Sequence, residues 1–380
     1  MRAVTCHQGQ LQVTEVADLD PGPGQVLLDV ERCGICGSDL HARVHADATA
    51  DDVAELGYPD FMRSTHTVVM GHEFVGTVAA YGPKCREAWP IGTRVVALPM
   101  LRQDGEIQLT GLSEKAPGGY AEQVLVAEAM AMSVPDGVSA EDAALTEPLA
   151  VALHAVRKGA AGRRDTAVVI GCGPIGLAVI AMLKATGVKR VVASDLSAGR
   201  RRLAEACGAD VVVDPREDPP WDHLGRRYLT EATALADTGL AAMEKLRRVP
   251  KLPWWQAIRA AERAGATPRG PVVFECVGVP GMIEQIVTDA PLLSRVVVVG
   301  VCMDADSFRP SMAINKELEL RFAFAYDPAE FHQTLQWIAA GKVDVSPFVT
   351  GTVGLAGVAD AFADLADPER HAKILIDPRR

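Results

Sequence analysis

The sequence predicts an α/β fold that combines a doubly wound parallel sheet with a second, β-rich part. Apolar strand patterns alternate with helix patterns between residues 150 and 343, which is typical of a parallel sheet covered by helices. A glycine-rich turn joins the first of these strands to the first helix. Short strand patterns separated by proline and glycine dominate the first 149 residues and indicate a compact barrel-like part.

The glycine-rich turn lies between a buried strand pattern and an apolar helix pattern. Gly171, Gly173 and Gly176 have the G-x-G-x-x-G spacing of a Rossmann dinucleotide site. The first glycine permits a tight turn, the second lets a pyrophosphate approach the backbone, and the third lets the helix pack closely. Pro174 and Ile175 complete the predicted cofactor-binding turn, where the helix N-terminus offers free N–H groups to phosphates.

A second apolar strand pattern ends in Asp195, 19 positions after Gly176. An acidic residue about 20 positions beyond the glycine turn accepts hydrogen bonds from the adenosine ribose. Its charge would repel a 2′-phosphate, so Asp195 favours NAD over NADP. The same residue is also a candidate helix N-cap, and both roles can hold at once. Arg200, Arg201 and Arg202 weaken the preference for NAD, because arginines here can accommodate a phosphate.

Bulk composition excludes several classes of protein. The formal net charge of −11, without a basic stripe, argues against a nucleic-acid partner. The apolar runs fall far short of the roughly 20 residues that span a bilayer, and the first ten residues contain no signal core. The eight scattered cysteines indicate reduced thiols or metal ligands rather than disulfides. We therefore expect a cytoplasmic protein that binds neither nucleic acid nor membrane.

Two clusters in the first part contain residue types that bind metals. They are CGICGSDLH (33–41) and GHE (71–73). A Cys-x-x-Cys pair can form a redox disulfide or half of a zinc site. A second pair is missing, which excludes a four-cysteine zinc, and we do not expect this pair to open a long helix as in a thioredoxin-like site. Cys33 is interpreted as a small buried residue and Cys36 as a candidate ligand.

Six motifs, in this order along the chain, resemble those of the zinc-dependent medium-chain alcohol and polyol dehydrogenases. They are GICGSDLH (34–41), GHE (71–73), PGGYAEQ (117–123), TEPLAVALHA (146–155), VVIGCGPIG (168–176) and FECVG (274–278). The resemblance covers nearly the whole chain. It implies a GroES-like catalytic β-barrel domain made of residues 1–149 and 344–380, interrupted by a Rossmann NAD-binding domain at 150–343.

The resemblance also implies a catalytic zinc site. Cys36 and His72 would be ligands, and Glu73 would lie beside the metal and ligate it transiently. Glu147 matches a ligating glutamate of the polyol branch, although water could take its place and the residue could simply favour a helix start. Asp39 would lie behind His72, where it would orient the imidazole ring and make it a more basic ligand for the metal. A zinc ion accepts thiolate, imidazole and carboxylate ligands of this kind.

Further site residues follow from the same resemblance. Ser38 and His41 match the family's proton relay. Four residues match positions that line the nicotinamide, although ordinary core packing explains the valines nearly as well; they are Val277, Gly278, Val299 and Val301.

One stretch departs from the family pattern. Many relatives carry a structural zinc in a lobe with four cysteines, but residues 99–117 contain none, so we predict one catalytic zinc per chain and no structural zinc. We expect this stretch and a long segment at 42–69 to be loops that shape the substrate pocket. A strand at 318–326 would pair across a two-fold axis, giving a homodimer or homotetramer.

The segment at about 215–270 is longer than a crossover between two strands requires. It contains at least two helix patterns, two interrupting prolines and three of the five tryptophans. We interpret it as an insertion of amphipathic helices whose apolar face must be buried. It either packs on its own domain or makes an assembly contact.

The function that this resemblance implies is hydride transfer between NAD(H) and a small secondary or polyol-like alcohol or its carbonyl product. Two alternatives remain at this point. One is a zinc-free quinone or enone reductase of the same fold. The other is a nucleotide-binding regulator that keeps the fold without catalysis. Metal content tests the first alternative, and NADH formation from alcohols tests the second.

Overall fold

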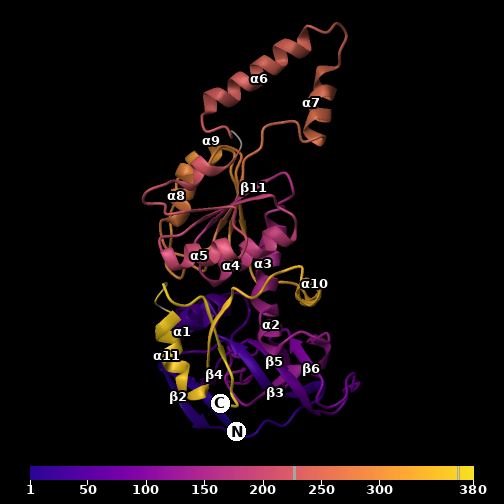
Figure 1. Cartoon of the computed structure of the whole chain (residues 1–380), viewed down its shortest axis with the longest axis vertical. Helices are drawn as coiled ribbons and strands as arrows, with labels where there is room; N and C mark the ends of the chain where they lie inside the picture. Colours follow the sequence, from indigo (N-terminus) through magenta and orange to yellow (C-terminus); the bar gives the residue numbers. More distant parts are fainter. Residues whose placement is uncertain (226–227, 366, 368) are drawn as a thin grey trace.

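The computed structural model describes residues 1–225, 228–365, 367 and 369–380. The molecule is elongated, with a β-rich half at the end that carries both termini, a parallel sheet with helices in the middle, and a helical hairpin beyond it (Figure 1). The α/β fold class is therefore as predicted. No helix among the described residues is long and apolar enough to cross a membrane.

The β-rich half is built on a seven-stranded sheet. Its strands in spatial order are β10 (Ala131–Ser133), β6 (Arg94–Ala97), β5 (Glu73–Tyr81), β3 (Gln25–Gly34), β18 (Lys373–Ile376) and β17 (Val349–Val353), and β9 (Gln123–Ala127) also pairs with β3. The last two strands in the chain thus return to the first half. In the antiparallel register of β18 and β3, Leu375 pairs with Gly34 and Ile376 with Cys33, so this return reaches the strand end beside the cysteine motif.

Smaller elements complete this half. They are β1 (Arg2–His7), β2 (Gln10–Glu15), β4 (Val68–Val69), the hairpin β7 (Met100–Gln103) and β8 (Glu106–Leu109), the 3₁₀ turns η1 (Glu128–Met130) and η3 (Leu355–Gly357), and helix α11 (Val358–Leu365).

The other half is a six-stranded sheet in which every strand pair is parallel. Its strands in spatial order are β13 (Val211–Val213), β12 (Arg190–Ser194), β11 (Thr166–Ile170), β14 (Val272–Glu275), β15 (Arg295–Val298) and β16 (Glu319–Phe322). Its helices are α4 (Pro174–Ala185), α5 (Ala198–Ala206), α8 (Met282–Asp289), α9 (Pro310–Asn315) and α10 (Pro328–Ala339). Helices α2 (Ala140–Ala144) and α3 (Thr146–Lys158) lead into it from the β-rich half. Strands that are buried on both faces explain the continuous apolar runs of the sequence.

One predicted strand is shorter than expected. The strand predicted at 318–326 begins at Glu319 and ends at Phe322. Ala325 has a φ of 54°, a left-handed conformation that interrupts an extended strand. The chain therefore turns at Ala325 instead of continuing along the sheet edge to Tyr326.

The expectation of a loop across 42–69 is wrong for its first part. Residues Gly37–Glu55 form helix α1, kinked at His45, and Cys36 is its N-cap. The Cys-x-x-Cys pair thus does follow a strand and open a long helix, contrary to the reason given against a redox role. All eight cysteines are nevertheless free of disulfides, as expected. The segment 99–117 likewise contains a hairpin, β7–β8, rather than loop alone.

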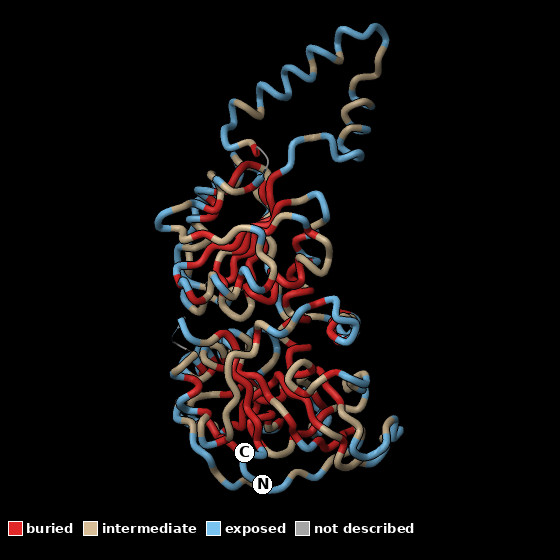
Figure 2. The backbone as a smooth tube through the Cα atoms, in the orientation of Figure 1, coloured by how far each residue is buried: buried red, intermediate tan, exposed pale blue. Residues whose placement is uncertain are grey.

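The insertion forms the 3₁₀ turn η2 (Pro220–His223) and helices α6 (Ala232–Arg247) and α7 (Trp254–Arg263). The two helices stand away from the sheet as a hairpin without a buried residue (Figures 1 and 2). No residue from 229 to 269 is buried. Packing of the insertion on its own domain, one of the two expectations, is therefore wrong for residues 229–269 of the single chain. It is right for the start of the insertion, where Leu224 and Tyr228 are buried against the parallel sheet.

Candidate metal site and cofactor cavity

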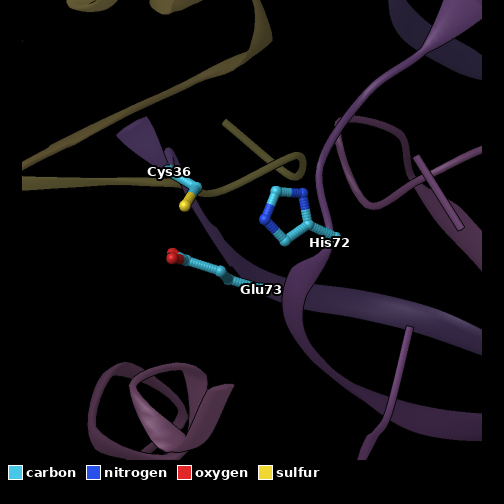
Figure 3. A group of neighbouring side chains, drawn as sticks. All are labelled: Cys36, His72 and Glu73. Carbon is cyan, nitrogen blue, oxygen red and sulfur yellow. The ribbon is translucent and has the colours of Figure 1, made fainter. Parts of the chain in front are cut away.

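Three metal-binding side chains converge where the two motifs of the β-rich half meet. The ligand atoms of Cys36, His72 and Glu73 all lie within 4.8 Å of one another, and Figure 3 shows the three side chains pointing toward a common space. Cys36 caps α1, and Glu73 begins β5. Gly71 makes the approach possible: its φ is 99°, and a Cβ there would lie 2.4 Å from the Tyr120 ring.

His72 is held from behind by a buried carboxylate. Its Nδ1 lies 3.2 Å from Oδ1 of Asp39, which is itself fully buried. Oδ2 of Asp39 accepts hydrogen bonds from the Tyr120 hydroxyl at 2.6 Å and the Cys36 backbone N–H at 3.0 Å. Burial lowers the pKa of His72, but the neighbouring side chains of Asp39 and Cys36 together outweigh it and raise that pKa well above its ordinary value. The carboxylate therefore fixes the ring so that Nε2 faces the site.

Glu73 has a partner that sequence reasoning missed. Lys373 on β18, almost fully buried, donates from Nζ to both carboxylate oxygens at 2.6 and 2.7 Å and to the Ile35 carbonyl at 3.1 Å. A buried charge pair of this kind is stable only when hydrogen bonds satisfy it. The available signal was a single lysine in an otherwise apolar terminal strand pattern. Glu73 therefore faces the site as one half of an ion pair.

Glu147 lies near the group but is not one of the three converging ligands. It sits in the first turn of α3 and is buried. Burial raises the pKa of its carboxyl to about 7, and the charge of Glu73 adds to the rise while that of His72 opposes it. Tyr326, beyond the end of β16, lies close to Glu147. Burial and the Glu147 charge raise the pKa of the Tyr326 hydroxyl. Sequence reasoning missed Tyr326, because only the turn at Ala325 directs it inward.

The two predicted relay residues lie on one face of α1. The Ser38 hydroxyl oxygen is 3.2 Å from Nε2 of His72, so it reaches the site directly. His41 is one helical turn further along and is exposed, with a pKa lowered by partial desolvation of the ring and by the neighbouring His45. Its ring centroid lies 6.5 Å from that of His45.

The donor set fits zinc. A thiol, an imidazole and a carboxylate within 4.8 Å are the ligand types that zinc takes in proteins, and the Asp39–His72 pair is the usual support behind such a ligand. Among the residues that the structure describes, this is the one group of three such side chains with converging ligand atoms.

A cavity of about 460 Å³ lies at the glycine-rich turn. The predicted residues among its lining are Gly171, Gly173, Asp195, Arg200 and Val277. Each predicted glycine role has a geometric counterpart. Gly171 has a φ of 88°, and a Cβ on Gly176 would lie 1.9 Å from the Gly171 carbonyl oxygen. Gly173 is the N-cap of α4, and the nearest atoms to its Cβ position are those of the Arg200 guanidinium at 3.9 Å. Pro174 and Ile175 form the first turn of α4.

Asp195 holds the turn together. Its Oδ2 accepts from the Cys172 N–H at 2.7 Å and its Oδ1 from the Ser197 N–H at 2.8 Å. The expectation that Asp195 caps the next helix is wrong, since Ser197 is the N-cap of α5 and accepts from the Arg200 N–H at 3.1 Å. Asp195 instead stands at the carboxyl end of β12, in the cavity, where a ribose would lie.

The remaining predicted residues divide into two groups. Val299 is buried within the core, whereas Val277 and Val301 are exposed. Gly278 has a φ of 70°, and a Cβ there would lie 2.6 Å from the Val301 carbonyl oxygen. Glu275, which sequence reasoning missed, accepts from the Val277 and Gly278 N–H groups at 2.7 and 2.8 Å and so fixes this loop.

Comparison with protein families assigns both halves of the chain. Residues 22–136 match the alcohol dehydrogenase GroES-like domain, and residues 174–237 match the zinc-binding dehydrogenase domain.

Full-length relatives agree with this assignment. (R,R)-butanediol dehydrogenase of Bacillus subtilis (strain 168) is 30% identical over 397 residues, covering 100% of both chains. Sorbitol dehydrogenase of Bos taurus is 28% identical, covering 93% of this chain and 89% of the relative. Among solved structures, that of 2R,3R-butanediol dehydrogenase from Bacillus subtilis superposes with a TM-score of 0.75 at 29% identity, covering 99% of each chain.

Proposed function

This chain belongs to the family of zinc-dependent medium-chain alcohol and polyol dehydrogenases, and we propose that it oxidises vicinal diols or small polyols at a secondary hydroxyl. As a member it is an oxidoreductase that transfers a hydride between an alcohol or its carbonyl product and a nicotinamide cofactor. The relatives named for butanediol and sorbitol support a diol or polyol substrate. Glu147, in place of a cysteine ligand, supports the same branch.

Cys36, His72 and Glu147 are the proposed zinc ligands, with water able to replace the glutamate. Zinc would act there as a Lewis acid that lowers the pKa of an alcohol oxygen. Glu73 lies within reach of the ion and is held by Lys373, so it is proposed as a transient ligand. We propose one catalytic zinc and no structural zinc, because residues 99–117 lack cysteine.

The proton of the alcohol leaves through the chain's own side chains. Ser38 is the group proposed to accept it, because its hydroxyl lies 3.2 Å from Nε2 of His72 and so borders the substrate position. His41, one turn further toward the surface, is proposed as the next acceptor, with a pKa that partial desolvation and His45 lower. A base near neutral pH suits such a transfer.

NAD is the proposed cofactor, and it would receive the hydride from the alcohol carbon. Asp195 supports this choice over NADP, because its carboxylate lines the cavity and would repel a 2′-phosphate. Arg200 also lines the cavity and stands over Gly173, where a Cβ would lie 3.9 Å from its guanidinium carbon. This position suits the pyrophosphate and so explains the arginine without a 2′-phosphate.

Assembly through the sheet edge is part of the proposal. β16 is the edge strand of the parallel sheet, and Phe322 and Phe324 beside it are 66% and 88% exposed. An open strand edge with exposed aromatic side chains favours pairing with the same edge of a second chain, which makes at least a homodimer.

The convergence of Cys36, His72 and Glu73 carries the proposal, and zinc content tests it. Protein purified without added metal or chelator should hold one zinc per chain and form NADH from vicinal diols faster than from primary alcohols. Absence of zinc, with none regained on soaking, would favour the zinc-free reductase. One zinc without NADH from any diol, polyol or simple alcohol would contradict the proposed activity and favour a regulator.

A further inference from the structure

The helical hairpin of the insertion is ordered without a core of its own. Between residues 229 and 269, called the arm below, no side chain is buried. Ordering a residue costs about 1–2 kcal/mol of backbone entropy, and a helix as short as α6 is marginal in water without packing. Figure 2 shows the arm as a segment without buried positions that stands away from the parallel sheet. Another surface must therefore cover it.

The arm presents an apolar and basic face. Trp255, Arg259 and Arg263 follow one another at intervals of four residues on α7, which places them on one side of that helix. Arg259 also forms an exposed ion pair with Glu262 of the same helix at 2.8 Å, a contact that a partner's carboxylates would have to compete with. Trp255 is 55% exposed, and Leu240 on α6 is 61% exposed. Seven of the chain's 38 basic residues and four of its 49 acidic residues lie in the arm, so the arm carries a net charge of +3 and the remainder −14.

The strong negative charge of the remainder makes a second copy of this chain a suitable partner. In the remainder of the chain, the outer face of α1 carries exposed acidic and apolar side chains that complement the basic and apolar face of the arm. Asp52 and Glu55 are exposed there, between the exposed apolar side chains of Val44 and Leu56. Among the described residues, Asp52 and Glu55 have no ion-pair partner, whereas Asp51 beside them pairs with Arg63 at 2.9 Å.

The lengths of the two helices also match. Ten residues of α7 span about 15 Å, and the α1 stretch from residue 44 to 55 spans about 18 Å. Within one chain the two helices cannot meet, because the arm and α1 lie in opposite halves of the elongated molecule (Figure 1). Two copies related by a two-fold axis that reverses the long axis would bring each arm beside the α1 of the other.

We propose that the arm binds a second copy of this chain. The Trp255–Arg259–Arg263 face of α7 packs on the acidic outer face of α1 in the partner. The contact is reciprocal, as a two-fold axis requires. It is separate from the sheet-edge contact proposed above and from the catalytic residues. Since α1 begins at Cys36, the arm rests on the helix whose first turn belongs to the metal site.

Charge reversal on each side tests the contact in the full-length protein. We expect Arg259→Glu with Arg263→Glu, or Asp52→Lys with Glu55→Lys, to raise the dissociation constant of the assembly about tenfold in sedimentation velocity. All four changes together should recover most of the loss. A control pair with the same charge change, Asp20→Lys with Glu106→Lys, lies outside both faces and should leave the dissociation constant within about twofold.

Tryptophan fluorescence gives a second readout that does not require dissociation, in case the sheet edge alone holds two chains together. The signal lost in Trp255→Phe reports Trp255, and acrylamide should quench it poorly in the wild type and readily in the Arg259→Glu, Arg263→Glu variant. Equal quenching in both, or a fourfold variant no better than either pair, would overturn the proposal. NADH formation, measured on the same samples, is independent of these outcomes and keeps the proposed function separately testable.

Discussion

Two polar regions of the β-rich half contrast in how their side chains are satisfied. At the metal site, Cys36, His72 and Glu73 direct ligand atoms into a shared space, while Asp39 and Lys373 hold them from behind.

The polar side chains of segment 99–117 instead pair with one another and with the neighbouring residues Tyr58 and Asp60. Gln108 and Ser113 are fully buried there. The Gln108 side chain donates to Asp60 at 2.6 Å and accepts from Ser113 at 2.7 Å, while Tyr58 accepts from the Leu109 N–H at 3.0 Å. Lys115 closes the network on Asp60 at 2.9 Å. The side chains of this region hydrogen-bond to one another and so stabilise the local fold. The side chains of the metal site direct their ligand atoms into a shared space and so indicate a bound ligand.

Removal of a converging ligand should have the largest effect. We expect Cys36→Ala to lose zinc and to reduce turnover by a factor of at least about 1,000, because a thiolate ligand cannot be replaced by a methyl group. The matched control is Cys33→Ala, three residues earlier and fully buried, which should keep one zinc per chain. Metal analysis and NADH formation measure the two effects in each variant. Full zinc content in Cys36→Ala would show that Cys36 is not a zinc ligand.

The next effect concerns the pH dependence of the zinc-depleted protein. The pKa of Glu147 is raised from 4.5 to about 7 in the folded chain, so folding favours its protonated form. Stability is therefore lost as pH rises from about 4.5 through about 7. Glu147→Gln should remove this loss and be more stable than the wild type by about 3 kcal/mol at pH 8, and equal to it at pH 4.

Urea unfolding of both zinc-depleted proteins at the two pH values measures this difference. A wild-type protein as stable as Glu147→Gln at pH 8 would show that the carboxylate is not held in a buried site. Since zinc itself favours the charged carboxylate, added zinc should stabilise the wild type more than the variant.

Loss of the support behind His72 should have a smaller effect on metal binding. Asp39→Asn keeps the shape of the side chain but removes the charge 3.2 Å from Nδ1. We expect about 10- to 100-fold weaker zinc binding, the usual loss for such a partner, with the zinc restored at high concentration. Competition with a chelator measures the affinity. Unchanged affinity would mean that Asp39 acts only through its hydrogen bonds to Tyr120 and Cys36.

The smallest effect should come from the paired region. Gln108→Ala removes the buried amide that donates to Asp60 and accepts from Ser113, and we expect it to destabilise the protein by about 1–3 kcal/mol. Zinc content should not change, since residues 99–117 supply no ligand to the proposed site. A loss of zinc in this variant, with folding intact, would show that the two regions are not independent.

Much of the site was predictable because its chemistry is local in the sequence. The glycine turn, its following helix and Asp195 come from one continuous βαβ stretch, and the G-x-G-x-x-G spacing dictates their geometry. The Cys36 and His72 motifs likewise indicated a metal. Helix α1 after Cys36 was not predictable, because it has no apolar stripe. The early end of β16 was not predictable either, because it depends on a single left-handed residue, Ala325, that leaves little signal in the sequence.

By itself, the sequence determined the α/β fold class, the glycine-rich turn between strand and helix, and the residue types of the proposed metal site, since periodicity and short spacings carry that information. Only the tertiary structure decided which distant groups meet. Lys373 reaches Glu73 from 300 positions away, and Tyr326 turns toward Glu147 from another element. The arm gives the opposite case, since its amphipathic pattern predicted burial that the single chain does not provide. Contacts between distant segments depend on the packing of the whole chain, which no local pattern contains.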